Sequence, residues 1–182
     1  MSVLTRCLLD KVVARRAVEG LLRLAEGDSL SEQELFAVDL LYASVEGRIR
    51  LFIVPSSKSV LDLLLRLPRY TVVIQAFLNH TETAFPTRYF ARWSRRLREF
   101  GYTPEDARVL ALASFGSDQG GNFIGMHWVA TYDQPLMSLW TQKQAAIARR
   151  LKAMSGQIPH PYSQAILPKV SKPEFVVTES SN

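Results

Sequence analysis

The sequence has little of what secreted, membrane-bound or cofactor-binding proteins require. Its single cysteine, Cys7, excludes a disulfide framework, and its place in an apolar run predicts a buried, inert thiol. No apolar run approaches the roughly 18 residues of a membrane span, and the chain does not open with an apolar signal segment. The three histidines share no metal-ligand spacing, and the glycines form neither a phosphate-binding loop nor a dinucleotide-binding motif. We therefore expect a cytoplasmic protein that is not inserted in a membrane.

The composition is typical of a folded domain that binds acidic partners. Hydrophobic residues make up 47% of the chain and aromatic residues 10%, which argues against disorder. The net charge of +5 favours nucleic acid or an acidic protein as a partner. We expect one domain over residues 1–154 and an extended C-terminal tail over residues 155–182, which contains four prolines and ends in polar residues.

Apolar strand-like runs alternate with helical patterns along the chain. Strands are expected at residues 3–9, 49–54, 81–85 and 128–133, with helices between them. Ser31 and Glu34 form a capping box at the start of a helix over residues 32–44, and Pro68 is expected to end a later helix. Residues 70–78 fit a strand or a helix, and the glycine-containing residues 116–125 are expected to form a mobile loop. This order predicts an α/β protein, a three-layer α/β/α sandwich around a mostly parallel sheet.

Four aspartates follow strand-like runs or lie on the helices after them. They are Asp10, Asp62, Asp106 and Asp133. In an open α/β sheet, ligands bind at the carboxyl ends of the strands, so these carboxylates can converge from distant parts of the chain. Carboxylate oxygens are hard ligands, and the pattern therefore predicts a Mg²⁺ or Mn²⁺ site.

The same residues resemble the motifs of the PIN-domain family. Leu8-Leu9-Asp10 resembles the end of the family's first strand, and Ser56 and Asp62 reproduce the spacing of its second motif. Asp106-Ala107 and Thr131-Tyr132-Asp133 resemble its last two motifs. The resemblance covers roughly residues 2 to 140, and the four motifs occur in the family's order.

The resemblance implies a metal-dependent endoribonuclease that cleaves single-stranded RNA. The four aspartates would be catalytic metal ligands, direct or through water, and Thr131 would orient Asp133 or a bound water. Many proteins of this family are toxins with an antitoxin partner, so the resemblance also implies a possible acidic, antitoxin-like protein and a homodimer.

Two features of the motifs favour a different interpretation. The family has Asn at the position of Val12 and Glu at the position of Asp62. Both changes affect the expected metal shell, and they favour a catalytically degenerate module that binds nucleic acid or a protein. Each aspartate can also be a helix cap or turn residue, and Asp62 can be an exposed polar residue within a helix.

A helix that we expect to begin near Pro86 carries a basic stripe. Its arginines follow helical spacing on one side, while the aromatic residues of the other side should be buried. The stripe fits phosphate contacts, a solvated helix face or the docking of an acidic protein. Its members are Arg88, Arg92, Arg95 and Arg96.

Overall fold

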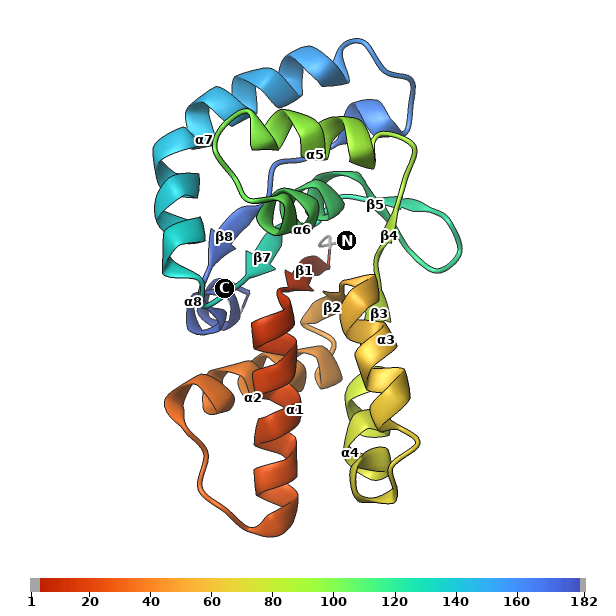
Figure 1. Cartoon of the computed structure of the whole chain (residues 1–182), viewed down its shortest axis with the longest axis vertical. Helices are drawn as coiled ribbons and strands as arrows, with labels where there is room; N and C mark the ends of the chain where they lie inside the picture. The colour runs from red at the N-terminus through yellow and green to blue at the C-terminus, as the bar shows by residue number, and fades with distance from the viewer. Residues whose placement is uncertain (1–3, 181–182) are drawn as a thin grey trace.

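A five-stranded, all-parallel sheet forms the centre of the computed structural model, which describes residues 4–180. The strand order is β3-β2-β1-β7-β8, so β1 lies in the middle of the sheet (Figure 1). In β1, Cys7 pairs with Leu51 of β2 on one side and with Trp128 of β7 on the other. The strands are β1 (Thr5–Leu9), β2 (Ile49–Ile53), β3 (Thr81–Thr83), β7 (Trp128–Ala130) and β8 (Lys169–Ser171).

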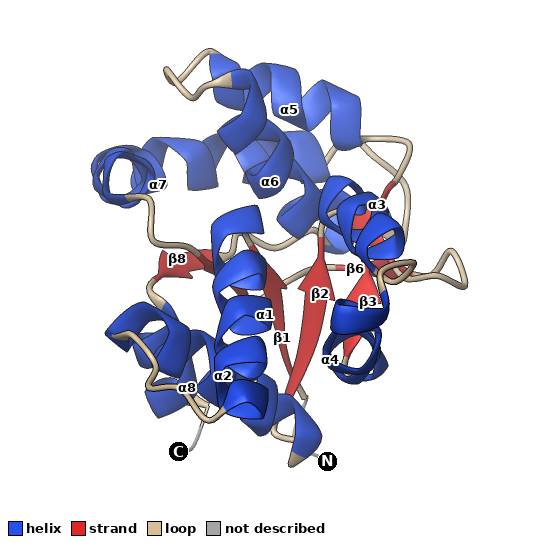
Figure 2. Cartoon of the chain, turned by 60° about the horizontal axis from the view of Figure 1, so that its bottom comes forward, coloured by secondary structure: helices blue, strands red, loops and turns tan. Residues whose placement is uncertain are grey.

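Helices cover both faces of this sheet (Figure 2). One face packs on α1 (Lys11–Glu26), α2 (Glu32–Val45), α3 (Pro55–Leu64), α4 (Pro68–Asn79) and α8 (Pro173–Glu179). The other face packs on α5 (Phe90–Arg98), α6 (Pro104–Phe115) and α7 (Gln134–Ser155). The predicted three-layer α/β/α arrangement is confirmed, and the central sheet is entirely parallel. None of the helices in residues 4–180 is long and apolar enough to cross a membrane.

Alternation along the strands explains why the central ones read as continuous apolar runs. Leu8 and Phe52 belong to the core on the α5–α6–α7 side, whereas Cys7, Leu9 and Leu51 belong to the core on the other side. All five are almost completely buried. A strand that is covered on both faces needs an apolar residue at every position, not at every second one.

Helix ends follow the local chemistry of the sequence. The capping box is present, because the Ser31 hydroxyl accepts from the Glu34 N–H while the Glu34 carboxylate accepts from the Ser31 N–H. Gly27 ends α1 in the left-handed region, with φ 79°, where a side chain would be strained. Pro68, which we expected to end a helix, instead begins α4 in the first turn, where a missing N–H costs nothing. Residues 70–78, whose sequence fits a strand or a helix, belong to this helix.

Two further sequence predictions differ from the structure near the middle of the chain. The strand expected at residues 81–85 is divided between β3 of the main sheet and β4 (Phe85–Pro86) of a small antiparallel sheet. Residues 116–125, expected to be a loop, contribute β5 (Gly116–Ser117) and β6 (Phe123–Ile124) to that same small sheet. The basic helix α5 begins at Phe90, so Arg88 precedes it.

Residues after Ser155 also differ from the predicted extended tail. A 3-10 turn (Tyr162–Gln164) is followed by β8, which pairs in parallel with β7 at the edge of the main sheet. Helix α8 then packs against α2, and its Val176 is fully buried in the core of that face. The described part of this segment is thus built into the α/β fold, because its few apolar residues complete a face that α1 and α2 leave open.

Candidate functional site

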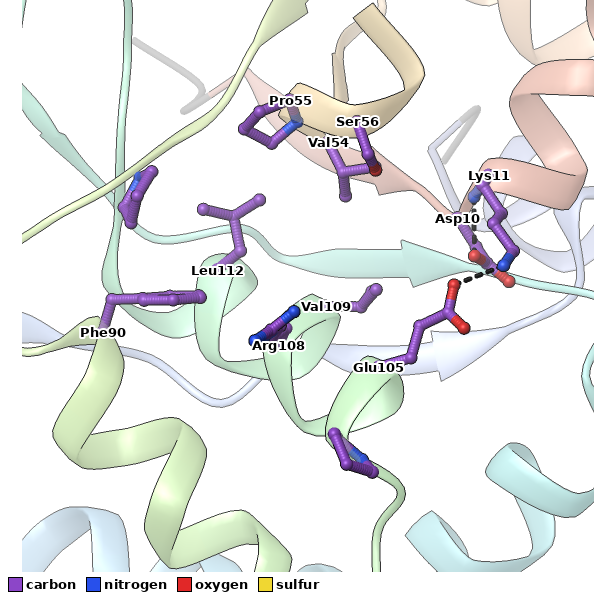
Figure 3. Close-up of a pocket in the computed structure, with 12 residues that line it drawn as sticks. Asp10, Lys11, Val54, Pro55, Ser56, Phe90, Glu105, Arg108, Val109 and Leu112 are labelled. Atoms are coloured by element: carbon purple, nitrogen blue, oxygen red, sulfur yellow. Dashed lines mark hydrogen bonds and ion pairs between the residues drawn. The ribbon is translucent and has the colours of Figure 1, made fainter. Parts of the chain in front are cut away.

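A cavity of about 520 Å³ opens at the carboxyl ends of β1 and β2 (Figure 3). We call it the strand-end cavity. Its wall opposite the strands is formed by α6, with Phe90 of α5 at one end. This is where ligands bind in open parallel sheets. The lining residues are Asp10, Lys11, Val54, Pro55, Ser56, Pro86, Phe90, Pro104, Glu105, Arg108, Val109 and Leu112.

Asp10 is tied to the end of β7 through one buried hydroxyl. The Thr131 hydroxyl donates to Asp10 Oδ2 at 2.9 Å and accepts from the Asp133 N–H at 3.0 Å. The two strand ends are adjacent at the point where the strand order reverses, so Thr131 holds together segments 121 residues apart. Three predicted site residues, Asp10, Thr131 and Asp133, are therefore brought together.

The predicted alternative of helix capping also holds for two of these residues. Asp10 is the N-cap of α1 and accepts from the Lys11 N–H at 2.6 Å. Asp133 is the N-cap of α7 and accepts from the Leu136 N–H at 2.8 Å. Both carboxylates therefore have a structural role at the switch between strand and helix.

Burial and a nearby carboxylate disfavour the charged form of Asp10. Burial raises the pKa of the Asp10 carboxyl above its usual value, while the hydrogen bond from Thr131 acts in the opposite direction. Lys11 forms an ion pair with Glu105 across the mouth of the cavity (Figure 3). The hydrogen bond to Glu105 raises the pKa of the Lys11 ammonium, and the charge of Glu105 further disfavours ionisation of Asp10.

Of the four predicted acids, Asp10 lines the cavity, whereas Asp133, Asp106 and Asp62 do not. Asp106 lies in the first turn of α6, where its carboxylate accepts from the Thr103 hydroxyl at 2.6 Å. Asp62 is an exposed residue of α3 and forms an ion pair with Lys58 one turn earlier. The interpretation of Asp62 as an exposed helix residue thus agrees with the structure.

The four predicted aspartates do not form one group of ligands in the described residues. Within residues 4–180, no group of three or more His, Cys, Asp or Glu side chains is placed to hold a metal. Of the two carboxylates that line the strand-end cavity, Glu105 already pairs with the Lys11 ammonium. For Glu105 to bind Mg²⁺ or Mn²⁺ beside Asp10, its ion pair with Lys11 would have to break, and at least one more acid would have to turn into the cavity. The metal centre therefore stays a prediction.

The remaining lining of the cavity combines an aromatic ring with an uncompensated cation. Phe90 and Leu112 form an apolar end, and Arg108 projects from α6 between that end and Glu105 (Figure 3). Arg108 is exposed, and no acidic side chain in the described residues forms an ion pair with it. Ser56, at the start of α3, adds a hydroxyl on the opposite side. Apolar surface with a few polar groups is typical of small-ligand sites.

The four arginines of the predicted stripe have different surroundings. Arg88 lies over the ring of Tyr89, with 5.5 Å between the guanidinium carbon and the ring centre. Arg96 pairs with Glu99 at 2.8 Å, and Arg95 is exposed. Arg92 and Arg96 line a second cavity, of about 240 Å³, against α7. The predicted burial of the other side holds for Trp93 and Leu97, which are fully buried, whereas Phe90 and Phe100 are half-buried and pack against the same core.

Sequence reasoning did not identify Lys11, Glu105 or Arg108 as residues of this site. A signal was present in α6, where Glu105, Arg108, Val109 and Leu112 follow i, i+3, i+4, i+7 spacing and share one helix face. Asp106 is rotated from that face by about 100°. Glu105, which lines the cavity, is therefore the sequence neighbour of the predicted residue Asp106.

Comparisons of this chain with protein-family models, curated proteins and solved structures found no match.

Proposed function

We propose that this protein is a PIN-like module that binds single-stranded RNA and holds one nucleotide in the strand-end cavity. The observation that supports this most directly is that Phe90 and Arg108 line the same cavity. An aromatic ring offers a stacking surface to any base, and a guanidinium without an ion pair can bind the adjoining phosphate. The volume of about 520 Å³ lies within the range of small-ligand sites, ~300–1,000 Å³.

The ion pair of Lys11 favours binding over cleavage. An ammonium attached to the chain lies between the Glu105 carboxylate and Asp10, at the place where the PIN resemblance would put a divalent ion. It pairs with Glu105, whereas Arg108 has no ion-pair partner among residues 4–180 and can bind a phosphate. The substitutions at Val12 and Asp62 support the same conclusion, because they alter the residues that would complete a metal shell.

A metal-dependent ribonuclease is the second candidate, and one observation favours it. Asp10 and Asp133 are linked through Thr131 at the reversal point of the strand order, and burial raises the pKa of the Asp10 carboxyl. Carboxyl groups with perturbed pKa values in a cleft are frequent at catalytic sites. An acidic, antitoxin-like partner and a homodimer stay predictions.

The first experiment measures RNA binding by fluorescence anisotropy with a labelled oligouridylate of about ten nucleotides, a typical site size for single-strand binders. We expect Arg108→Ala to weaken binding roughly tenfold and to lower the slope of log K against log salt by about one phosphate contact. Phe90→Leu keeps the apolar contact and removes the ring, so it should weaken binding about fivefold or more. Arg66→Ala is the matched control, because Arg66 is exposed and lines no described cavity.

The outcome decides between the candidates. Equal losses in Arg108→Ala and Arg66→Ala would mean that RNA senses only net charge, and the cavity assignment would be wrong. The same samples are then incubated with Mn²⁺ or with EDTA and analysed on gels. Cleavage that needs Mn²⁺ and disappears in Asp10→Asn would establish the ribonuclease. Binding without cleavage would support the degenerate module.

A further inference from the structure

Three arginines line the second cavity, which lies between α5 and the later turns of α7 and which we call the arginine pocket. Arg92 and Arg96 come from successive turns of α5, and Arg150 comes from α7. The two helices lie side by side in Figure 1, and the pocket shares no lining residue with the strand-end cavity. The other residues around its volume of about 240 Å³ are Ala153, Met154 and Gln157.

Two of these three arginines, Arg92 and Arg150, neither lie in the last turn of their helix nor form an ion pair within residues 4–180. Arg96 pairs with Glu99 and lies in the last turn of α5, where a cation favours the helix dipole. Arg92 lies before that turn, and Arg150 lies before the last turn of α7, whose basic residue is Lys152. Within residues 4–180, neither Arg92 nor Arg150 has an acidic ion-pair partner. Moreover, like charges one turn apart destabilise a helix slightly, and an anion bound to Arg92 would reduce its repulsion of Arg96.

The shape of the pocket suits a compact anion. Met154 is buried, and Ala153 contributes only a methyl group to the lining. None of the six residues that line the pocket is acidic. Guanidinium groups present N–H donors in a rigid fork that matches two oxygens of one phosphate.

We propose that the arginine pocket binds a terminal phosphate, that is, a phosphomonoester. Three arginines line the pocket and Glu99 pairs with one of them, so two uncompensated positive charges remain. A phosphomonoester carries about −1.5 to −2 charges near neutral pH, which matches this excess better than the single charge of a phosphodiester. The phosphate can belong to the end of an RNA strand, in which case the inference rests on the proposed RNA binding, or to a free nucleotide or inorganic phosphate.

The test compares four proteins, namely the wild type, Arg150→Ala, Arg150→Lys and Arg149→Ala. Arg149 is the exposed neighbour on α7 and does not line the pocket, so its variant removes the same charge. Inorganic phosphate is titrated by calorimetry at constant ionic strength. We expect Arg150→Ala to weaken phosphate binding about tenfold or more, because charge-assisted hydrogen bonds are lost. Arg150→Lys should be intermediate, and Arg149→Ala should match the wild type.

A second measurement identifies the source of the phosphate. Oligouridylates with a 5′-phosphate, a 3′-phosphate or no terminal phosphate are compared by anisotropy. A preference for one phosphorylated end that is lost in Arg150→Ala, but kept in Arg108→Ala at weaker overall binding, would assign the pocket to an RNA end. Phosphate binding without any end preference would support a free phosphate ligand.

Two results would overturn the inference. One is inorganic phosphate that binds the wild type and Arg150→Ala equally. The other is phosphate that does not bind the wild type and does not raise its melting temperature, since a ligand of the folded state must stabilise it. Loss of RNA binding in Phe90→Leu with phosphate binding intact, or the reverse, separates failure of the strand-end cavity from failure of this pocket.

Discussion

Replacing Thr131 by Val should remove the side-chain link between the ends of β1 and β7, which the backbone bond from the Asp10 N–H to the Ala130 carbonyl still joins, without changing the shape of the core. Thr131 is completely buried, and Val has nearly the same volume. The substitution removes the donor to Asp10 Oδ2 at 2.9 Å and the acceptor of the Asp133 N–H at 3.0 Å. Asp10 keeps its bond from the Lys11 N–H, so the fold should survive the change.

The expected cost follows from these two bonds. A hydrogen bond to a charged group contributes about 1.5–3 kcal/mol and one between neutral groups about 0.5–1.5 kcal/mol. Since Asp10 is only partly buried, water can replace some of the lost interaction. We therefore expect Thr131→Val to lower the free energy of unfolding by roughly 2–3 kcal/mol, a large share of the ~5–15 kcal/mol of a typical domain.

Urea unfolding at pH 7, followed by circular dichroism, measures this difference by linear extrapolation. Thr141→Val is the matched control, because the Thr141 hydroxyl donates to the Met137 carbonyl on the exposed surface of α7. It should change stability by less than about 0.5 kcal/mol. The pKa of Asp10 should also rise in Thr131→Val, which carboxyl-carbon NMR can follow, because the Thr131 bond lowers it. Equal stabilities for the two variants would refute the assigned role of Thr131.

Two more predictions concern titratable groups of the core strands. Burial raises the pKa of Asp10 in the folded protein, so protonation of Asp10 favours the folded state. This contribution to the free energy of unfolding is complete below the ordinary pKa of aspartate and is lost as pH rises through the pKa of Asp10 in the folded protein. The wild type should therefore lose stability relative to Asp10→Asn between pH 3 and pH 7 in urea titrations, and a gain over this interval would contradict the assignment. Burial also raises the pKa of the Cys7 thiol to about 12, and the side chain has no exposure. The thiol reagent DTNB should label Cys7 only after unfolding, and labelling of the native protein within the mixing time would show that β1 is accessible.

The fold could be predicted because its signals are local. Strands β1 and β2 contain the apolar runs Cys7-Leu8-Leu9 and Leu51-Phe52-Ile53, and the capping box at Ser31 marks a helix start in the sequence itself. Strand β8 gives no such signal. It has three residues, begins with an exposed lysine and lies at the sheet edge, so only its pairing with β7 makes it a strand. Helix α4 had a strand-like composition, and its tertiary contacts decided the outcome.

The candidate site could be predicted in part, for a related reason. Asp10 and Thr131 directly follow strands, so their positions depend only on the sheet. Glu105 and Asp106 are neighbours on α6, and the orientation of that helix determines which one meets the cavity. The ion pair of Lys11 with Glu105 joins residues from different elements that no spacing rule connects.

Docking of α8 against α2 has a consequence for the order in which the chain can fold during synthesis. Val176 of α8 completes the core cluster that also contains Ala17 of α1 and Leu40 of α2. Helices α1 and α2 are therefore fully packed only after α8 has been synthesised. At synthesis rates of ~5–20 residues per second, that delay is on the order of ten seconds. During this interval, the part of the α1–α2 hairpin that α8 will cover is exposed to chaperones and to other nascent chains.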